Sequence, residues 1–162
     1  MQSALLPPDE KERLDKVMRL GILDTPPEER FDAITRRAVK DLGVPISTIT
    51  LIDKDREWYK SCQGVEAREV PRTVSFCAHA MLVKEIFIVE DTLLDDRFKD
   101  NPMVVGFPFL RFYAGVALHD KQGTAIGVFC VKDTKPRKLT MDDIGKILRL
   151  AEQAEKELQK PS

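Results

Sequence analysis

The side chains best suited to chemistry gather between Arg72 and Cys130. The string RTVSFCAHA, residues 72–80, contains Cys77, one of three cysteines, and His79, one of two histidines. Side chains two positions apart do not face each other on a helix, so this pair is not a local nucleophile–base couple. A closed metal site here would need ligands from distant segments. We therefore interpret Cys77 as a small buried apolar residue and His79 as a hydrogen-bonding group within its own segment.

A second group of polar side chains follows in the Asp-rich stretch EDTLLDDRFKDNP and just beyond it. Arg97 and Arg111 suit bidentate recognition of a carboxylate or phosphate. The alternative is that these residues form internal salt bridges and caps that hold a long loop in place. Arg72 fits either role. The aromatic residues nearby, Phe98 and Tyr113 among them, are more typical of a core than of a cofactor site.

The overall charge argues against one class of function. The 162 residues carry a formal net charge of −1, with 26 basic and 27 acidic side chains. Without a basic excess, nucleic-acid binding driven by counterion release is not expected. Three cysteines without a CxxC pair favour reduced thiols in a cytoplasm. No signal peptide or membrane-length apolar stretch is visible, so we expect a cytoplasmic protein without direct membrane insertion.

The first half of the chain predicts two helices and a β-hairpin. Residues 9–20 form an amphipathic pattern that ends at Gly21. Thr25 and Glu28 match a capping box, which predicts that the next helix begins near Pro26 and ends at Gly43. The strings ISTITLID and REWYKSCQG then predict a central strand and its partner, followed by a polar loop over residues 65–73.

The second half predicts a short helix, a strand, a long excursion, a hairpin and a final helix. VSFCAHAMLV fits the short helix with Ser75 or Thr73 available as a cap, and EIFIVED fits the strand. The excursion covers residues 91–109, and a loop this long is often functional. RFYAGVALHD and TAIGVFCVKD predict the clearest hairpin, in which Gly115 and Gly127 admit close approach of a backbone or ligand. Thr140 and Asp143 form a capping box that opens the last helix.

Five strings in order carry a family resemblance: GILDTPPEERFD, RTVSFCAHA, DDRFKDNPMVVGFP, RFYAGVAL and GVFCVKD. Together they resemble a GAF domain of the kind found beside histidine kinases and diguanylate cyclases. The resemblance covers about residues 9–158. It implies an α+β fold with a central, mainly antiparallel six-stranded sheet, helices packed on one face and a roofed pocket on the other.

The resemblance also sets the expected domain layout and the candidate site. Residues 1–162 are expected to form a single domain, with N-terminal helices over about 9–42, sheet and roof over about 44–133, and a C-terminal helix over about 140–159. The region matching residues 72–109 is expected to roof the pocket. The candidate residues for pocket and roof are Arg72, Ser75, Phe76, Cys77, His79, Asp91, Arg97, Phe98, Asn101, Arg111 and Tyr113.

No cofactor or metal is expected, because each familiar GAF ligand is disfavoured. GAF domains that attach a bilin covalently place His directly after the attachment Cys, and here Ala78 separates Cys77 from His79. The cyclic-nucleotide signature of phosphodiesterase GAF domains is not recognisable, and haem is also disfavoured. The identity of any small ligand stays open.

These observations predict a non-enzymatic sensory or regulatory domain in signal transduction that binds a small ligand. Its expected partners are a second copy, through the terminal helices, and a kinase or cyclase output domain in the same or another chain. One alternative is a thiol-dependent reductase of a small oxidised metabolite, because free methionine sulfoxide reductases are GAF proteins. Cys62, Cys77 and Cys130 do not match that family's cysteine pattern. The other alternative is a ligand-free dimerisation module.

Overall fold

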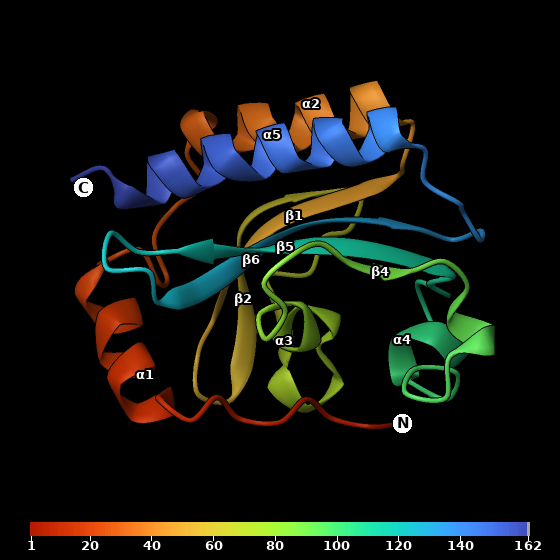
Figure 1. Ribbon diagram of the computed structural model, residues 1–162, viewed down its shortest axis with the longest axis horizontal. Helices are drawn as coiled ribbons and strands as arrows, with labels where there is room; N and C mark the ends of the chain where they lie inside the picture. Colours follow the sequence, from red (N-terminus) through yellow and green to blue (C-terminus); the bar gives the residue numbers. More distant parts are fainter. Residues whose placement is uncertain (162) are drawn as a thin grey trace.

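The computed structural model describes residues 1–161 (Figure 1). The chain begins with two helices and ends with one, and the sheet lies between them. In order, the elements are α1 (Glu10–Arg19), α2 (Glu29–Leu42), β1 (Ile46–Ile52), β2 (Arg56–Gln63), β3 (Glu69–Pro71), η1 (Arg72–Val74), α3 (Phe76–Ala80), β4 (Phe87–Val89), η2 (Thr92–Leu94), α4 (Pro102–Val105), β5 (Phe112–His119), β6 (Ala125–Asp133) and α5 (Met141–Gln159).

The six strands form one sheet in the order β3-β2-β1-β6-β5-β4, and every pairing is antiparallel. Strand β1 lies inside the sheet, and all seven of its residues are buried. Its β-branched residues suit a position covered on both faces. Gly127 permits the close pairing of β6 with β1, since a Cβ there would lie 2.1 Å from the Thr50 carbonyl oxygen. The predicted six-stranded antiparallel α+β fold is confirmed.

Helices α2 and α5 lie side by side across one face of the sheet (Figure 1). The predicted capping box opens α5: Thr140 accepts from the Asp143 amide, and Asp143 accepts from the Thr140 amide. The buried side of α5 and that of α2 meet a single apolar cluster that includes Phe31, Phe129 and Ile147. We call this side of the sheet the helix face.

The opposite side carries α3, α4 and the N-terminal segment, and we call it the roof face (Figure 1). A second apolar cluster fills much of it, with Phe76 stacked on Phe98 at 4.2 Å between ring centroids. Residues 1–8 run beneath α3, where Gln2 donates to the Arg97 carbonyl at 3.0 Å and Ser3 to the Thr73 carbonyl at 2.8 Å. The roof is therefore held by a segment far away in sequence.

The local predictions fail at two places. Helix α2 begins at Glu29 with Glu28 as its cap, not near Pro26, and Thr25 does not cap it. The Thr25 hydroxyl instead donates to the Ile22 carbonyl and accepts from the Lys60 ammonium, a partner that only the fold supplies. The predicted loop over residues 65–73 contains the short edge strand β3, which pairs with the start of β2. Three residues are too few for a recognisable alternating pattern.

Within residues 1–161, no helix is both long enough and apolar enough to cross a lipid bilayer.

Candidate functional site

A cavity of about 230 Å³ opens on the roof face, near the β2–β3 loop. Its floor is formed by one residue from each of three strands: Ile46 of β1, Tyr59 of β2 and Lys132 of β6. One wall comes from the β2–β3 loop and β3, and the other from α4 and the segment that leads into β5. The wall residues are Val65, Glu66, Ala67, Val70, Met103, Phe107, Pro108 and Leu110.

Backbone hydrogen bonds anchor both walls of this cavity. The Tyr59 amide donates to the Arg68 carbonyl at 2.9 Å, which fastens the β2–β3 loop to the sheet. On the other side, the Leu110 amide donates to the Met103 carbonyl at 2.9 Å, which closes the segment between α4 and β5. Loops held in this way keep a cavity open between them, because neither wall is free to collapse onto the other.

Lys132 is the most unusual residue of the cavity. It is 4% exposed, yet among residues 1–161 its ammonium has no hydrogen-bond acceptor and no carboxylate within 4.0 Å. It lies 5.8 Å from the centroid of the Tyr59 ring and 6.0 Å from that of Tyr113, near the outer limit of cation–π attraction. Burial acts to lower the pKa of Lys132, whereas the acidic groups around it, Glu57 among them, act to raise it, and the net direction is upward. The amine is therefore cationic.

Tyr59 adds a hydroxyl to the same cavity. Its side chain is 3% exposed, and in the described part of the chain its hydroxyl has no hydrogen-bond partner. Burial raises the pKa of Tyr59 far above its usual value, so the hydroxyl keeps its proton and is available as a donor. Tyr59 and Lys132 thus bring a phenol and an ammonium to a cavity whose other lining residues are mostly apolar.

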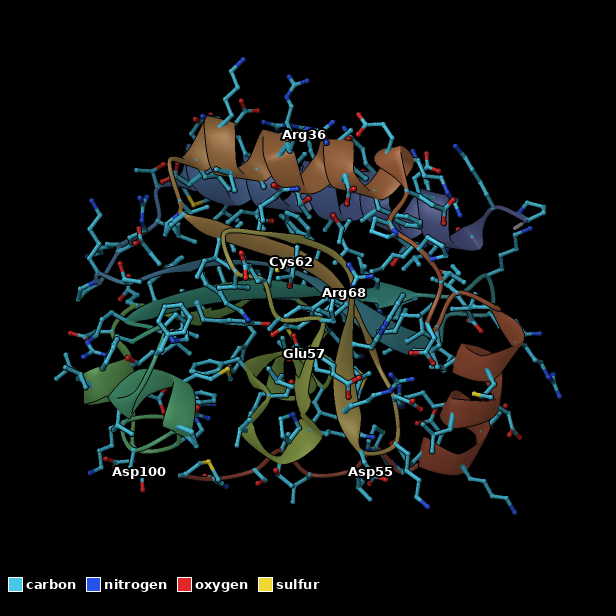
Figure 2. All side chains as sticks on the ribbon, turned by 180° about the vertical axis from the view of Figure 1, so that it is seen from behind. Arg36, Asp55, Glu57, Cys62, Arg68 and Asp100 are labelled. Carbon is cyan, nitrogen blue, oxygen red and sulfur yellow. The ribbon has the colours of Figure 1, made fainter. Side chains whose placement is uncertain are left out.

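A second open polar group lies deeper on the roof face, at the start of β2. Glu57 points toward α3 (Figure 2), and its Oε1 accepts from the Ser75 hydroxyl at 2.6 Å. Its Oε2 is buried without a partner among residues 1–161. Ser75 also accepts from the Ala78 amide at 2.9 Å and caps α3, as the sequence predicts. One serine thus links a buried carboxylate to the first helix of the roof.

The three cysteines do not offer an exposed thiolate. Cys77 and Cys130 are fully buried, and Cys77 accepts from the Tyr113 hydroxyl at 3.1 Å. Burial raises the pKa of the Cys77 thiol, and burial also raises the pKa of Cys62 to about 11. Burial acts to raise the pKa of Cys130 too, but Cys77 and Lys132 lower it below its usual value, so only its complete burial argues against reactivity there. Reactive cysteines are accessible and have lowered pKa values, so this geometry does not favour the thiol-dependent reductase alternative.

Five of the predicted candidate residues lie together where α3 packs on the sheet, in a mainly aromatic cluster. They are Phe76, Cys77, His79, Phe98 and Tyr113. The side chains fill the space that the sequence analysis assigned to a ligand. His79 lies at the margin of the cluster, where its Nε2 is 2.9 Å from the Gln2 carbonyl oxygen. None of the five lines the 230 Å³ cavity.

The remaining polar candidates mainly hold the roof in position. Arg72 pairs with Glu10 at 2.8 Å, Asp91 accepts from the Leu93 amide, and Arg97 pairs with Asp95 at 2.7 Å. Their contacts match the structural interpretation that the sequence left open. A ligand-binding role for any of the eleven candidates stays a prediction.

Two of the polar candidates, Asn101 and Arg111, act on the cavity wall without lining it. Asn101 caps α4 through the Met103 amide and also donates to the Val74 carbonyl at 3.0 Å. Arg111 donates to the Val104 and Leu110 carbonyls at 2.9 and 3.0 Å. Both side chains therefore fix the position of Met103 and Leu110, which face the cavity.

Neither Lys132 nor Tyr59 was predicted as a site residue, although the sequence contains one signal for Lys132. Lys132 ends the apolar run AIGVFCV and shares a strand face with Val128 and Cys130, two positions apart in each case. A lysine that continues a buried strand face is unusual. That signal does not identify Tyr59 or the cavity walls, because they come from other strands and from loops.

A wider depression of about 530 Å³ lies between α1, the β5–β6 turn and the end of α5. Exposed Arg19, Lys121 and Lys160 surround it, and their charged groups face solvent. Its lining also includes the mostly buried Lys16, but the ammonium of Lys16 already donates to the Thr124 hydroxyl at 2.7 Å. Within residues 1–161, no three His, Cys, Asp or Glu side chains converge on a possible metal site. We therefore take the 230 Å³ cavity as the candidate site.

A six-stranded antiparallel sheet between a layer of helices and a roof is the architecture of the GAF class of regulatory domains. A GAF domain family model matches residues 26–158, so the chain belongs to this family, as the resemblance predicted. GAF domains typically occur with kinase or cyclase output domains, which gives the chain a signalling context.

One relative and two solved structures illustrate this membership. The chain is 42% identical over 131 residues to the cyclic di-GMP phosphodiesterase PA2567 of Pseudomonas aeruginosa, a match that covers 81% of this chain and 22% of that protein. The GAF domain of an Acinetobacter phosphoenolpyruvate-protein phosphotransferase is 15% identical, with a TM-score of 0.67 and 94% of each chain covered. The free methionine-R-sulfoxide reductase of Neisseria meningitidis is 16% identical, with a TM-score of 0.64, and the match covers 98% of this chain and 96% of the reductase.

These comparisons correct one expectation. The prediction that the protein is not an enzyme is wrong, because the relative at 42% identity is named as a phosphodiesterase. The reason for the error is that a regulatory domain and an enzyme often share one polypeptide, and this chain spans only about a fifth of the length of the phosphodiesterase.

Proposed function

We propose that this chain is the regulatory domain of a cyclic di-GMP phosphodiesterase, acting within the same polypeptide or on a separate one. The 42% identity to part of such an enzyme supports this assignment. The domain senses a small molecule in the 230 Å³ cavity and passes the binding event to helices on the other side of the sheet. The whole of residues 1–162 serves as that sensing unit, in the cytoplasm.

The observation that carries the proposal is a short chain of contacts from the cavity to the helix face. Asp133 follows Lys132 directly and forms an ion pair with Arg137. Arg137 donates to the Leu42 carbonyl at 3.1 Å and to the Gly43 carbonyl at 2.6 Å, at the C-terminus of α2. In this proposal, a movement at the end of β6 reaches α2 through the Asp133–Arg137 ion pair and the two hydrogen bonds from Arg137.

Helices α2 and α5 then form the output surface in this proposal. They pack on each other, and the exposed part of α5 includes Leu148 at 44% exposure. A second copy of the domain pairing through the terminal helices stays a prediction that fits this arrangement. In such a dimer, a shift of α2 relative to α5 changes the spacing of whatever follows the domain.

A chimera tests the proposal. This chain replaces the matching segment of the Pseudomonas aeruginosa phosphodiesterase, and the hydrolysis of cyclic di-GMP is measured. Ala67→Trp fills the cavity at its rim, and Arg137→Gln removes the link to α2. We expect each variant to change the rate by about fivefold or more, the lower end of typical allosteric couplings.

Leu94→Trp is the matched control, because Leu94 lies on the roof but is 84% exposed and does not line the cavity. The control is expected to keep the rate of the unmodified chimera. Equal rates in all three variants, with each domain folded by circular dichroism, would show that the domain does not regulate the enzyme.

A further inference from the structure

The cavity contains a positive charge that the fold does not neutralise. An isolated ammonium is costly to bury, and buried charges are normally paired with an opposite charge or fully hydrogen-bonded. At 4% exposure, Lys132 has neither kind of partner among residues 1–161, and its ammonium retains a small contact with solvent, since Glu57 Oε2 is the only fully buried side-chain polar atom without a partner in that range. Its charge is nevertheless retained, as the direction of its pKa indicates. An unpaired cation at the bottom of a cavity is a ready-made site for an anion.

The nearby carboxylates do not fulfil this role. Glu57 is buried, but its oxygens lie beyond 4.0 Å from the Lys132 ammonium, and one of them bonds to Ser75. Glu66 belongs to the cavity wall, but it is exposed and lies at the rim. The distance to Glu57 is still short enough for its charge to act on Lys132, which keeps the amine protonated before any ligand arrives.

We propose that the cavity binds a small organic monocarboxylate, with its carboxylate on Lys132 and Tyr59 and its apolar body against the walls. The ammonium and the phenol supply donors for the two carboxylate oxygens, and a charge-assisted hydrogen bond is the stronger kind. Most wall residues are apolar, including Val70, Met103 and Leu110, so they suit a hydrocarbon chain or ring. This ligand class rests on the proposed sensory function.

The size of the cavity limits the ligand further. About 230 Å³ corresponds to the space of roughly eight water molecules at about 30 Å³ each, and it lies below the ~300 Å³ at which sites for drug-sized ligands begin. Cyclic di-GMP, with two nucleotides, does not fit. A phosphate group is also disfavoured, because its charge of about −1.5 to −2 at pH 7 would face a single ammonium in a mostly apolar cavity. A carboxylate on a short apolar body meets both limits.

Isothermal titration of the 162-residue chain with hexanoate and benzoate tests the ligand class. Hexanamide and benzamide are the matched neutral probes, because they keep the shape and remove the charge. We expect at least one carboxylate to bind with a Kd of about 1 mM or tighter, which needs only ~4 kcal/mol from eight or nine heavy atoms. The corresponding amide is expected to bind at least about tenfold more weakly.

Three variants assign the binding to the cavity floor. Lys132→Met is expected to weaken carboxylate binding by about tenfold or more, and Tyr59→Phe by about threefold to tenfold, as for a charged and a neutral hydrogen bond. Lys135→Met removes an exposed lysine three positions further along and leaves binding unchanged. Thermal unfolding of each variant confirms that it is folded, and Tyr59→Phe retains nearly the full volume of the native ring.

Several results would overturn the inference. The first is that neither carboxylate binds at a concentration tenfold above the expected Kd of ~1 mM. The second is that the acid and its amide bind equally well. The third is that the wild type and folded Lys132→Met bind the carboxylate equally well. The proposed function fails separately: carboxylate binding that leaves the rate of the chimeric phosphodiesterase unchanged refutes regulation but keeps the ligand class. If Ala67→Trp changes the rate of the chimeric phosphodiesterase but no carboxylate binds, the ligand class is refuted and regulation by the domain is kept.

Discussion

Two lysines are buried in the same sheet, and their surroundings differ completely. Lys60, with a side chain that is 0% exposed, lies at the edge near α2 and pairs with Glu28 at 2.7 Å. It also donates to the Thr25 hydroxyl and the Pro26 carbonyl, both at 2.7 Å. Lys132, 4% exposed on the roof face, has no such partner among residues 1–161.

The same contrast extends to the polar residues around each lysine. On the helix face, Ser61 and Thr35 bond to each other at 2.8 Å, and Ser61 also donates to Asp32 at 2.6 Å. On the roof face, one oxygen of Glu57 is buried and unbonded within the part of the chain that the structure describes. Satisfied polar groups stabilise the native fold, whereas open ones cost free energy and need another explanation. This difference is the reason why we propose the roof face as the side for binding.

The largest effect is expected at the serine that supports Glu57. Ser75→Ala removes the cap of α3 and the only described partner of the carboxylate. Losing a cap costs about 1 kcal/mol, and an unsatisfied buried group costs about 1–3 kcal/mol more. The free energy of unfolding by urea should therefore fall by about 2–4 kcal/mol.

Ser3→Ala is the control for this change, because its hydroxyl bonds to the same roof from an exposed position. It should change the unfolding free energy by less than about 0.5 kcal/mol. A similarly small effect for Ser75→Ala would mean that Glu57 is satisfied in solution by another group.

The next effect is expected at the paired lysine. Lys60→Met leaves the Thr25 hydroxyl and the Pro26 carbonyl without their donor, while the half-exposed Glu28 returns to water. Chemical denaturation should show a loss of about 1.5–3 kcal/mol, the range for hydrogen bonds to a charged group. A neutral result would remove the distinction between the two lysines.

Lys132→Met should raise the free energy of unfolding, whereas Lys60→Met should lower it. Replacing an unpaired buried charge by an apolar side chain of similar length relieves its desolvation without breaking a hydrogen bond. We expect the unfolding free energy to rise by about 1 kcal/mol in the absence of ligand. A loss as large as that of Lys60→Met would show that Lys132 is structural. Lys135→Met again serves as the exposed control.

The smallest effect concerns pH and the edge of the roof. Burial, with a contribution from Arg97, lowers the pKa of His79, although the hydrogen bond to Gln2 acts in the other direction. In the unfolded chain the pKa returns to about 6.5, so the unfolded state takes up a proton first. The stabilising contribution is complete above pH 6.5 and is lost as the pH falls through the lower folded value.

Urea midpoints at pH 7.5 and 5.5 measure this contribution. They should show a small loss of stability at the lower pH, and His79→Gln should reduce that loss because its amide keeps a donor for the Gln2 carbonyl without titrating. An identical pH dependence in the variant would assign the loss to another group.

Much of the fold follows from local sequence. The capping box at Thr140 and Asp143, the glycine that ends α2 and the alternating hairpin around Gly123 all act within a few residues, so they can be recognised without tertiary contacts. The ordered strings near the roof were also sufficient to predict the family. The predicted start of α2 is wrong because Thr25, the expected cap, accepts a hydrogen bond from the distant Lys60 instead.

The sequence by itself determined the type of most elements, because periodicity and capping are properties of neighbouring residues, and its family resemblance implied the six-stranded sheet and the roof. Only the tertiary structure decided that the space beneath α3 is filled by Phe76 and Tyr113, while a cavity remains beside β3. It also decided that Lys60 meets an acid and Lys132 does not. Pairing in space depends on segments 30 or more residues apart, and no local pattern records which side chains they bring together.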